Sequence, residues 1–309
     1  MADLPISLIK VARPIHWVKN LSVFAALLFT GYLYHKFPFF TVFWAFICFC
    51  LITSTAYIIN DILDIKADRV HPIKKNRPIA SGKLPVSIAL IEAVVLAFLA
   101  IILAQSLGNL FSYLVWTYLI LQVLYSVKLK NIPIVDILII AFGFILRVYA
   151  GAVVINAHLS VWFLLCVISI ALFLASGKRR AELNIKTTTF GATRQSLNNY
   201  NKGLLNSYVT MFGNAAWVSW ALFTFFEGPK ASLPIWLVLA ELSKTTTIGK
   251  LLMITIPVVI FGIMRYEYLI FGDKSEAPEK VLLTDKALTI TVAAWIGLVV
   301  WVFYGGVSI

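Results

Sequence analysis

The chain has 309 residues, of which 61% are hydrophobic and 13% are charged, whereas a soluble globular chain carries about 25% charged residues. Apolar stretches of about 20 residues recur along it, and each is long enough to span a bilayer core. The composition therefore excludes an ordinary soluble domain and predicts an all-α polytopic membrane protein. The net charge of +12 is compatible with a nucleic-acid partner unless the positions of the basic residues have another explanation.

We predict nine transmembrane helices and no separate soluble domain. The first apolar run lacks a signal-peptide cleavage pattern and is expected to be retained as a helix. A short apolar run within 227–248 is expected to lie along the outer interface. The nine predicted spans are 15–34, 39–60, 86–106, 110–127, 133–155, 160–176, 206–226, 249–271 and 286–306.

Most of the 26 Lys and Arg residues fall on one side of these spans. The segments that carry them are the N-terminus, 61–85, 128–132, 177–205 and 272–285. By the positive-inside rule this side is cytoplasmic, so the N-terminus is predicted inside and the C-terminus outside, in the inner (cytoplasmic) membrane. The positive charge thus accounts for topology, and we expect no nucleic-acid partner.

An acidic stretch, Asn60-Asp61-Ile62-Leu63-Asp64-Ile65-Lys66-Ala67-Asp68, follows the second span. If the helix continues through it, Asp61, Asp64 and Asp68 share one face at i, i+3 and i+7. Clustered carboxylates repel, so a hard divalent cation that also holds a phosphorylated substrate would stabilise them. A solvated acidic helix end is the alternative. It is the weaker one, because the chain has only 14 acidic residues and three of them share this face.

Further polar clusters lie on the same predicted side of the membrane. Their members are Arg77, Lys83, Tyr125, Lys128, Lys130, Asp136, Lys178, Arg179, Arg180, Glu182, Arg194 and Tyr200. Acids that face several basic groups suit a substrate rich in phosphate, because a metal neutralises a diphosphate while Arg and Lys hold the remaining oxygens. A role as topology anchors is about equally compatible with the basic residues at 128–130 and 178–180.

Two arginines lie within predicted spans. Arg147 is near the middle of the bilayer, where a lipid-facing arginine is costly, so it should face a cavity or a carboxylate. A structural ion pair and a place in the substrate cavity both remain open for it. Arg265 is nearer the cytoplasmic end, where it contacts substrate or extends its charge to the interface.

Together these residues resemble the UbiA superfamily of intramembrane prenyltransferases. The pattern Asn60-Asp61-x-x-Asp64-x-x-x-Asp68 after the second of nine spans is similar to the superfamily's first aspartate-rich motif. Within the superfamily, the chain is most similar over nearly its whole length to the branch that uses a polyprenyl phosphate as phosphoribosyl acceptor. The supporting stretches are Arg13-Pro14-Ile15-His16-Trp17-Val18-Lys19-Asn20, Asn76-Arg77-Pro78-Ile79-Ala80-Ser81-Gly82, Tyr125-Ser126-x-x-Leu129-Lys130, Gly143-Phe144-x-x-Arg147-x-x-x-Gly151-Ala152, Gly177-Lys178-Arg179-Arg180-x-Glu182-Leu183, Arg265-Tyr266 and Pro278-Glu279.

The resemblance implies an enzyme that transfers 5-phosphoribose from phosphoribosyl diphosphate to a decaprenyl-type polyprenyl phosphate and releases diphosphate, on the route to arabinose donors for cell-envelope glycans. It implies Mg²⁺, with Mn²⁺ as an alternative, on Asp61, Asp64 and Asp68. Asn60 is expected to orient an aspartate or to contact the ribose, and Lys19 to hold the lipid phosphate. Residues 1–309 would form one transmembrane catalytic domain, with loops 61–85 and 177–205 as the active-site cap.

Two other functions are compatible with the sequence. An aromatic prenyltransferase of the same superfamily would use a prenyl diphosphate and ignore phosphoribosyl diphosphate. A transporter would usually carry its charged groups at mid-membrane on several helices, whereas the acids here gather at one surface. Lipid-facing and subunit-facing surfaces look alike in the sequence, so a homo-oligomer is compatible with either.

Overall fold

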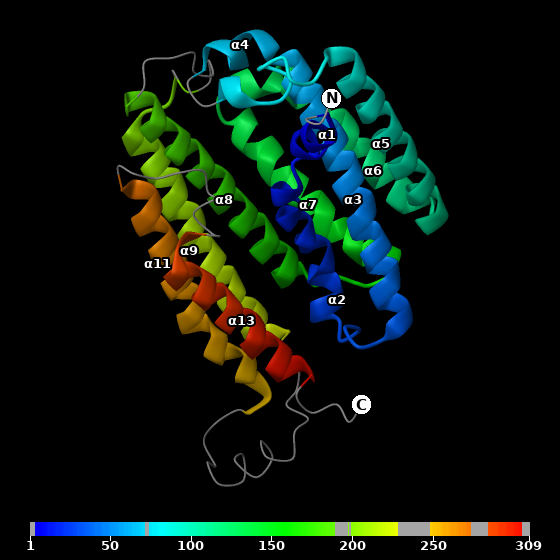
Figure 1. Cartoon of the computed structure of the whole chain (residues 1–309). Coiled ribbons are helices and arrows are strands. Elements are labelled where there is room, and N and C mark those ends of the chain that lie inside the picture. The colour runs from blue at the N-terminus through cyan, green and yellow to red at the C-terminus, as the bar shows by residue number, and fades with distance from the viewer. Residues whose placement is uncertain are drawn as a thin grey trace. The chain divides into compact units, whose positions relative to one another are not determined.

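The structure is a computed structural model in which the secondary structure is helical (Figure 1). It describes residues 4–71, 74–188, 197, 199–227, 248–272 and 284–304. The chain divides into two compact units, the first comprising Met1–His158 with Lys186–Tyr200 and the second Leu159–Ile185 with Asn201–Ile309.

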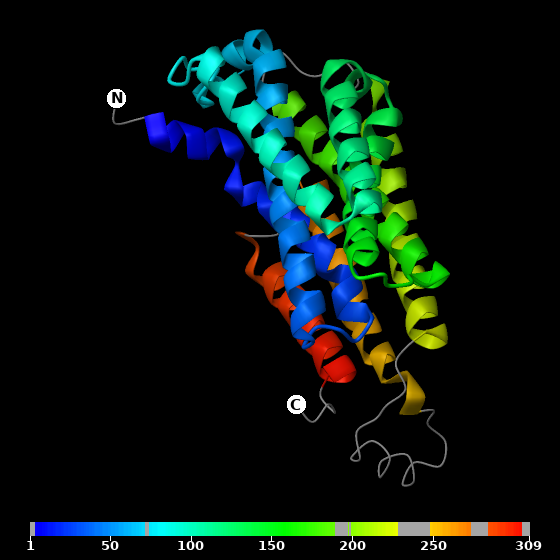
Figure 2. The same cartoon turned by 90° about the vertical axis from the view of Figure 1, so that its right-hand side faces the viewer.

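The first unit is built around four long helices joined by short helical segments. In chain order its elements are α1 (Leu4–Ala12), the 3₁₀ segment η1 (Pro14–Phe24), α2 (Ala25–Phe29), α3 (Lys36–Leu63), α4 (Ile65–Val70), η2 (Lys74–Asn76), α5 (Val86–Leu107), α6 (Asn109–Val127), η3 (Leu129–Asn131) and α7 (Val135–Val154). The long helices α3, α5, α6 and α7 run side by side, whereas α1 lies at an angle to α3 (Figures 1 and 2).

Among the described residues, eight helices are long and apolar enough to cross a membrane. They correspond to the second to ninth predicted spans. Most of their ends agree to within a few residues, because long apolar runs fix the position of a spanning helix better than its boundary. The prediction of an all-α polytopic membrane protein is confirmed.

The first predicted span, 15–34, does not form a single α-helix. It consists of η1 followed by α2, which ends at Phe29. A 3₁₀-helix rises about 2.0 Å per residue and an α-helix about 1.5 Å, so the two segments together extend about 30 Å, the thickness of a bilayer core. The residues predicted to be a membrane segment therefore have the length for it in a different helical form.

The side chains of η1 alternate between exposed and inward positions with a repeat of three residues, which matches the 3₁₀ form of this segment. In a 3₁₀-helix, side chains three positions apart lie in line. The exposed row of η1 is Ile15, Val18 and Leu21, and the inward row is Trp17, Asn20 and Val23. The apolar row thus faces outward while the inward row carries the polar Asn20, the reverse of the arrangement in a soluble protein.

Gly151 allows η1 to approach α7 closely. A Cβ atom at this position would lie 1.9 Å from the Val23 carbonyl oxygen, so no other residue fits without moving the backbone. The core beside this contact is formed by Leu27, Phe49, Phe111 and other apolar side chains from α2, α3 and α6. This packing fixes the position of η1, which follows Arg13 and carries Lys19.

The second unit packs α8 (Val161–Thr188) with the C-terminal helices. The others are α9 (Lys202–Phe226), η5 (Ile248–Thr255), α11 (Ile256–Phe271) and α13 (Lys286–Tyr304). Its core contains Phe173, Tyr266 and Ile270. The helix predicted to end at 176 continues to Thr188, so the first residues of the predicted loop 177–205 are helical. The helix continues through this stretch because its Lys, Arg, Ala and Glu residues are good helix formers.

Candidate functional site

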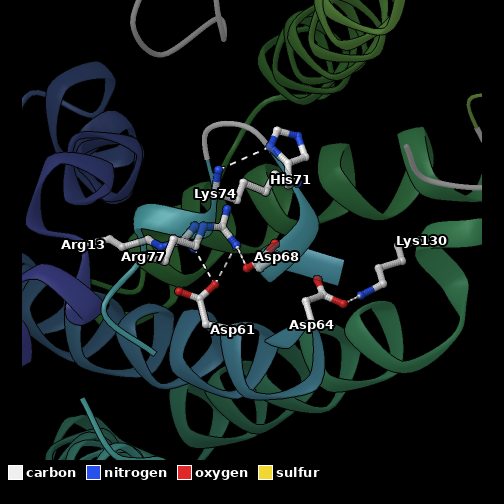
Figure 3. A network of polar contacts seen from close by, with 8 residues as sticks. All are labelled: Arg13, Asp61, Asp64, Asp68, His71, Lys74, Arg77 and Lys130. Atoms are coloured by element: carbon white, nitrogen blue, oxygen red, sulfur yellow. Dashed lines mark hydrogen bonds and ion pairs between the residues drawn. The ribbon is translucent and has the colours of Figure 1, made fainter. Parts of the chain in front are cut away.

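The aspartate cluster, Asp61, Asp64 and Asp68, lies where α3 passes into α4. The helix is interrupted at Asp64, whose φ and ψ are −94° and 6°. The backbone bonds continue across the break, since the Asp64 N–H donates to the Asn60 carbonyl at 3.0 Å and the Asp68 N–H to the Asp64 carbonyl at 2.8 Å. The condition of a continuous helix is therefore met except at Asp64, and Asp61 and Asp68 lie on one side (Figure 3).

Arg77 joins Asp61 and Asp68. Its Nη1 atom donates to Asp61 Oδ1 at 2.9 Å and to Asp68 Oδ2 at 2.6 Å (Figure 3). Arg13 Nη2 donates to the same Asp61 oxygen at 2.5 Å. Both carboxylates are almost fully buried, with 2% of Asp61 and 3% of Asp68 exposed. Buried charges require partners of opposite sign, and two guanidinium groups supply them.

Asp64 has a different partner. The Lys130 ammonium group donates to Asp64 Oδ1 at 2.5 Å, from the turn between α6 and α7 (Figure 3). Lys130 is 8% exposed, so this ion pair is largely shielded from water. The three aspartates predicted to form one set are therefore divided between two groups of cations.

The donor chemistry at Asp61 and Asp68 fits a hard divalent cation, which prefers carboxylate oxygens. One positively charged nitrogen of Arg77 already lies within hydrogen-bond distance of an oxygen from each. In this conformation, the described part of the chain has no group of three or more acidic, His or Cys residues placed to hold a metal ion. The two carboxylates thus fit such a cation in chemistry, whereas in this structure a guanidinium nitrogen lies between them.

Arg13 is a site residue that the sequence reasoning did not select. It adopts a left-handed conformation, with φ 54° and ψ 60°, and its guanidinium group also lies 4.9 Å from the centre of the Tyr57 ring. Both cluster arginines directly precede a proline, Pro14 and Pro78. Because the residue before proline is kept out of the α conformation, the repeated Arg-Pro pair was the signal that could have identified Arg13.

His71 follows the cluster and accepts a hydrogen bond from the Lys74 backbone N–H at Nδ1, at 3.3 Å (Figure 3). Burial lowers the pKa of His71, and the positive charge of Lys74 lowers it further. The imidazole is therefore neutral at pH 7 beside the cluster, which keeps it available as a hydrogen-bond acceptor.

Arg147 is buried, but its partners are neutral. Its Nε atom donates to Asn20 Oδ1 at 2.7 Å, Nη1 to the Gly143 carbonyl at 2.6 Å and Nη2 to the Tyr118 hydroxyl at 2.6 Å. The guanidinium group also lies 4.8 Å from the Tyr118 ring centre. The structural ion pair left open for Arg147 is thus not formed with any described carboxylate. Asn20 and Tyr118 were not predicted, since nothing in the sequence pairs them with α7.

Asp136 and Tyr200 are brought together at the start of α7. The Tyr200 hydroxyl donates to Asp136 Oδ1 at 2.8 Å and accepts the Ile134 backbone N–H at 2.5 Å. Asp136 is fully buried and Tyr200 is 6% exposed. These two predicted substrate contacts thus bond to each other at the start of α7.

The remaining predicted residues of the first unit are more accessible. Lys83 and Lys128 are exposed, and Asn60, Lys19 and Tyr125 are half-buried. Lys19 lies on the face of η1 between the exposed and the inward rows. The predicted roles of these five side chains stay predictions.

The predicted residues of the second unit form contacts of their own. Arg179 is fully buried and donates to Glu182 at 2.5 Å, and Arg180 Nε donates to Asn206 Oδ1 at 2.6 Å. Lys178 is half-buried beside them on α8, and Arg194 lies outside the described residues.

Arg265 links α11 to the beginning of α13. Its Nε and Nη2 atoms donate to the two carboxylate oxygens of Asp285 at 3.2 and 2.7 Å. Asp285 Oδ1 also accepts the Leu288 N–H at 2.8 Å, which caps α13. This contact gives Arg265 a structural function, and its predicted substrate contact stays a prediction.

Comparison with known proteins shows the family to which the chain belongs. The pattern of the UbiA prenyltransferase family matches residues 21–240. The decaprenyl-phosphate phosphoribosyltransferase of Corynebacterium glutamicum is 35% identical over 307 residues, covering 98% of this chain and 88% of that protein. The enzyme of the same name from Mycolicibacterium smegmatis is 34% identical, covering 96% of this chain and 92% of that protein.

Solved structures share the fold. A UbiA homologue from Archaeoglobus fulgidus, bound to GPP and Mg²⁺, superposes with a TM-score of 0.70 at 16% sequence identity, covering 96% of this chain and 99% of that chain. At this identity the likeness concerns the fold alone.

Proposed function

Because the chain belongs to the UbiA prenyltransferase family, we propose that it transfers 5-phosphoribose from phosphoribosyl diphosphate to a decaprenyl-type polyprenyl phosphate. The observation that carries this proposal is a similarity to decaprenyl-phosphate phosphoribosyltransferases that extends over nearly the whole of both chains. The product would be a lipid-borne phosphoribose, a precursor for the arabinose units of cell-envelope glycans.

The polar cluster supports a diphosphate-bearing substrate. Three carboxylates and the cations Arg13, Arg77 and Lys130 balance one another in charge. Guanidinium groups bind phosphate oxygens as well as they bind carboxylates, through the same paired donors. Arg13, Arg77 and Lys130 would therefore exchange their carboxylate partners for the oxygens of the donor's diphosphate.

The bond changes follow from this placement. The bond between C1 of the ribose and the diphosphate oxygen breaks, the diphosphate leaves with the electron pair, and C1 gains oxocarbenium character, as in other glycosyl transfers. An anionic oxygen of the polyprenyl phosphate donates a pair to C1 from the opposite face. Because this oxygen is already deprotonated near pH 7, the residues have no proton to remove, and their contribution is positioning and charge stabilisation.

Asp61, Asp64 and Asp68 would hold Mg²⁺, whose chemistry when bound is to neutralise the charge that develops on the leaving diphosphate. Each aspartate is available to a metal only when its present cation has moved to the substrate. The structure of the Archaeoglobus fulgidus homologue carries Mg²⁺, and the carboxylate oxygens of this cluster are ligands that Mg²⁺ prefers.

Lys19 would hold the lipid phosphate, since η1 presents it beside an exposed apolar row suited to the bilayer. Lys83, Tyr125 and Lys128 would contribute to the entrance of the site. By the distribution of positive charge, the site would face the cytoplasm.

The test uses purified protein with Mg²⁺, a polyprenyl phosphate and phosphoribosyl diphosphate labelled in the ribose. We expect label in the organic phase only when all three components are present. Absence of labelled lipid, together with turnover of a prenyl diphosphate and an aromatic acceptor, would instead make the chain an aromatic prenyltransferase. Flux of a solute in liposomes without a chemical product would make it a transporter.

A further inference from the structure

The turn that leads into α7 contains a strained residue, Ile134. Its φ and ψ are 69° and −49°, and the Val135 N–H donates to the Pro133 carbonyl at 2.8 Å. These features define a γ-turn of the rare hand, with φ and ψ near about +75° and −65°. A β-branched residue is an outlier at positive φ, so the surrounding structure must hold it there.

One hydroxyl group holds both ends of this turn. Tyr200 accepts the Ile134 N–H at 2.5 Å and donates to Asp136 Oδ1 at 2.8 Å. The hydrogen bond from Ile134 fixes the strained peptide itself, and the bond to Asp136 fixes the first turn of α7. Because Asp136 is fully buried, its carboxylate provides a rigid and strong acceptor for the hydroxyl.

The turn carries Lys130 four residues before Ile134. The intervening segment has little freedom, since Pro133 restricts its backbone, the Ile132 N–H donates to the Leu129 carbonyl at 3.2 Å, and the Asp136 N–H donates to the Ile132 carbonyl at 3.1 Å. A change at Ile134 would therefore be transmitted to Lys130, whose buried ammonium group meets Asp64 at 2.5 Å.

We propose that Tyr200 is a positioning residue that, by holding the strained turn at Ile134, sets the place of Lys130 against Asp64 for the transfer reaction. This inference rests on the proposed function, in which Lys130 passes from Asp64 to a phosphate oxygen. Tyr200 itself touches the turn and not the substrate. The strain at Ile134 is then the means by which Lys130 is held in a single orientation.

The first experiment compares Tyr200→Phe with the parent protein. The substitution removes both hydrogen bonds and keeps the ring. Misplacement of a catalytic group by about 1 Å costs on the order of 10²-fold in rate, so we expect kcat/KM for phosphoribosyl diphosphate to fall by about that factor. The matched control is Tyr113→Phe, at a side chain that is 67% exposed, and its activity should equal that of the parent.

A second substitution separates positioning from direct contact. Glycine adopts positive φ without steric cost, so Ile134→Gly would let the turn persist without the hydroxyl. We expect Ile134→Gly in the Tyr200→Phe background to restore most of the lost activity. If Tyr200→Phe is impaired and Ile134→Gly gives no recovery, Tyr200 acts on the substrate directly and the proposal is overturned.

A third readout does not depend on activity. Lys130 is 8% exposed whereas Lys128 is exposed, so an amine-reactive reagent followed by mass spectrometry should label Lys128 and spare Lys130 in the parent. We expect Tyr200→Phe to raise Lys130 labelling several-fold relative to Lys128, and Ile134→Gly to reverse the rise. Parent-like labelling of Lys130 in Tyr200→Phe overturns the proposal. A parent protein without phosphoribosyl transfer refutes the proposed function instead, and the labelling still decides whether Tyr200 holds the turn.

Discussion

Replacing Arg77 with methionine tests whether a cation is required between Asp61 and Asp68. The substitution removes the guanidinium group but keeps an apolar side chain of similar reach. Asp61 retains its bond to Arg13. Asp68, whose side chain is 4% exposed, loses the one cation with which it forms an ion pair among the described residues.

The expected loss of stability follows from burial. Removing one partner of a fully buried ion pair costs about 3–5 kcal/mol, because the other charge remains desolvated. The Arg77 side chain is 24% exposed, so solvent screens part of the interaction, and we expect a loss of about 2 kcal/mol. The thermal midpoint in detergent, measured by size-exclusion chromatography of heated samples, should fall by several degrees.

Mg²⁺ should act more strongly on the Arg77→Met protein than on the parent. In the parent, a metal at Asp61 and Asp68 must displace a guanidinium group, whereas in the variant the place is vacant. A ligand at 100 times its Kd stabilises by about 2.7 kcal/mol, which is enough to offset the loss. We therefore expect Mg²⁺ to raise the thermal midpoint of the variant towards that of the parent.

The matched control is Arg69→Met in the same segment. Arg69 is exposed, and among the described residues its side chain donates one long bond, 3.4 Å, to the Ala80 carbonyl, so its replacement should leave both the midpoint and the Mg²⁺ response unchanged. Equal midpoints for Arg77→Met and the parent without Mg²⁺ would refute the burial argument. Arg77→Met could instead have a lower midpoint than the parent while Mg²⁺ raises the midpoints of both proteins by the same amount. That result would refute the idea that Arg77 occupies a cation site.

Three further outcomes are expected. Replacing any member of the aspartate cluster with asparagine should abolish transfer while leaving a folded protein in detergent, and full activity in all three variants would exclude the cluster as the metal site. Lys19→Ala should raise the half-saturating concentration of polyprenyl phosphate more than that of phosphoribosyl diphosphate; the reverse would assign Lys19 to the donor. The Arg265 side chain lowers the pKa of Asp285, and the Leu288 N–H lowers it further, so this carboxylate adds stability above its unfolded pKa of about 3.9 that is lost as the pH falls through the lower folded value. The thermal midpoint of Asp285→Asn should thus lie below that of the parent at pH 7, and the difference should shrink as the pH falls below the unfolded pKa of about 3.9. A difference that stays constant as the pH falls would contradict the assignment.

The fold could be predicted wherever a segment is regular. Eight spans follow from apolar length alone, because a bilayer core demands about 20 residues of helix. The segment predicted as the first span, 15–34, has a form that the sequence did not predict. Its residues repeat every three positions, with Ile15, Val18 and Leu21 exposed, and a search for the 3.6-residue period of an α-helix has no means of recognising that repeat.

The sequence predicted the acids of the candidate site and two of their cationic partners, Arg77 and Lys130, but not which carboxylate each cation meets and not the third partner, Arg13. The spacing of Asp61 and Asp68 places them on one helix face whether or not Asp64 interrupts it. Arg13 and Lys130 reach the cluster from 48 and 66 residues away. The Arg-Pro pair marks Arg13 in the sequence, but the carboxylate that Arg13 or Lys130 meets depends on how η1, α3 and the turn before α7 pack, and no local pattern encodes that packing. The left-handed conformation of Arg13 is equally a product of that packing.

The ion pairs of the aspartate cluster should couple the binding of the metal to the binding of the diphosphate. Asp61, Asp64 and Asp68 carry three negative charges, and Arg13, Arg77 and Lys130 carry three positive charges, so the ion pairs leave no net charge to attract a metal or a phosphate alone. A diphosphate that takes the cations would leave three carboxylates unpaired, two of them buried, at a cost of several kcal/mol each. A metal that takes the carboxylates would strand the cations in the same way. The metal neutralises the carboxylates that the diphosphate would leave unpaired, and the diphosphate neutralises the cations that the metal would leave unpaired. By linkage, the site should therefore bind the two ligands together far better than either one by itself.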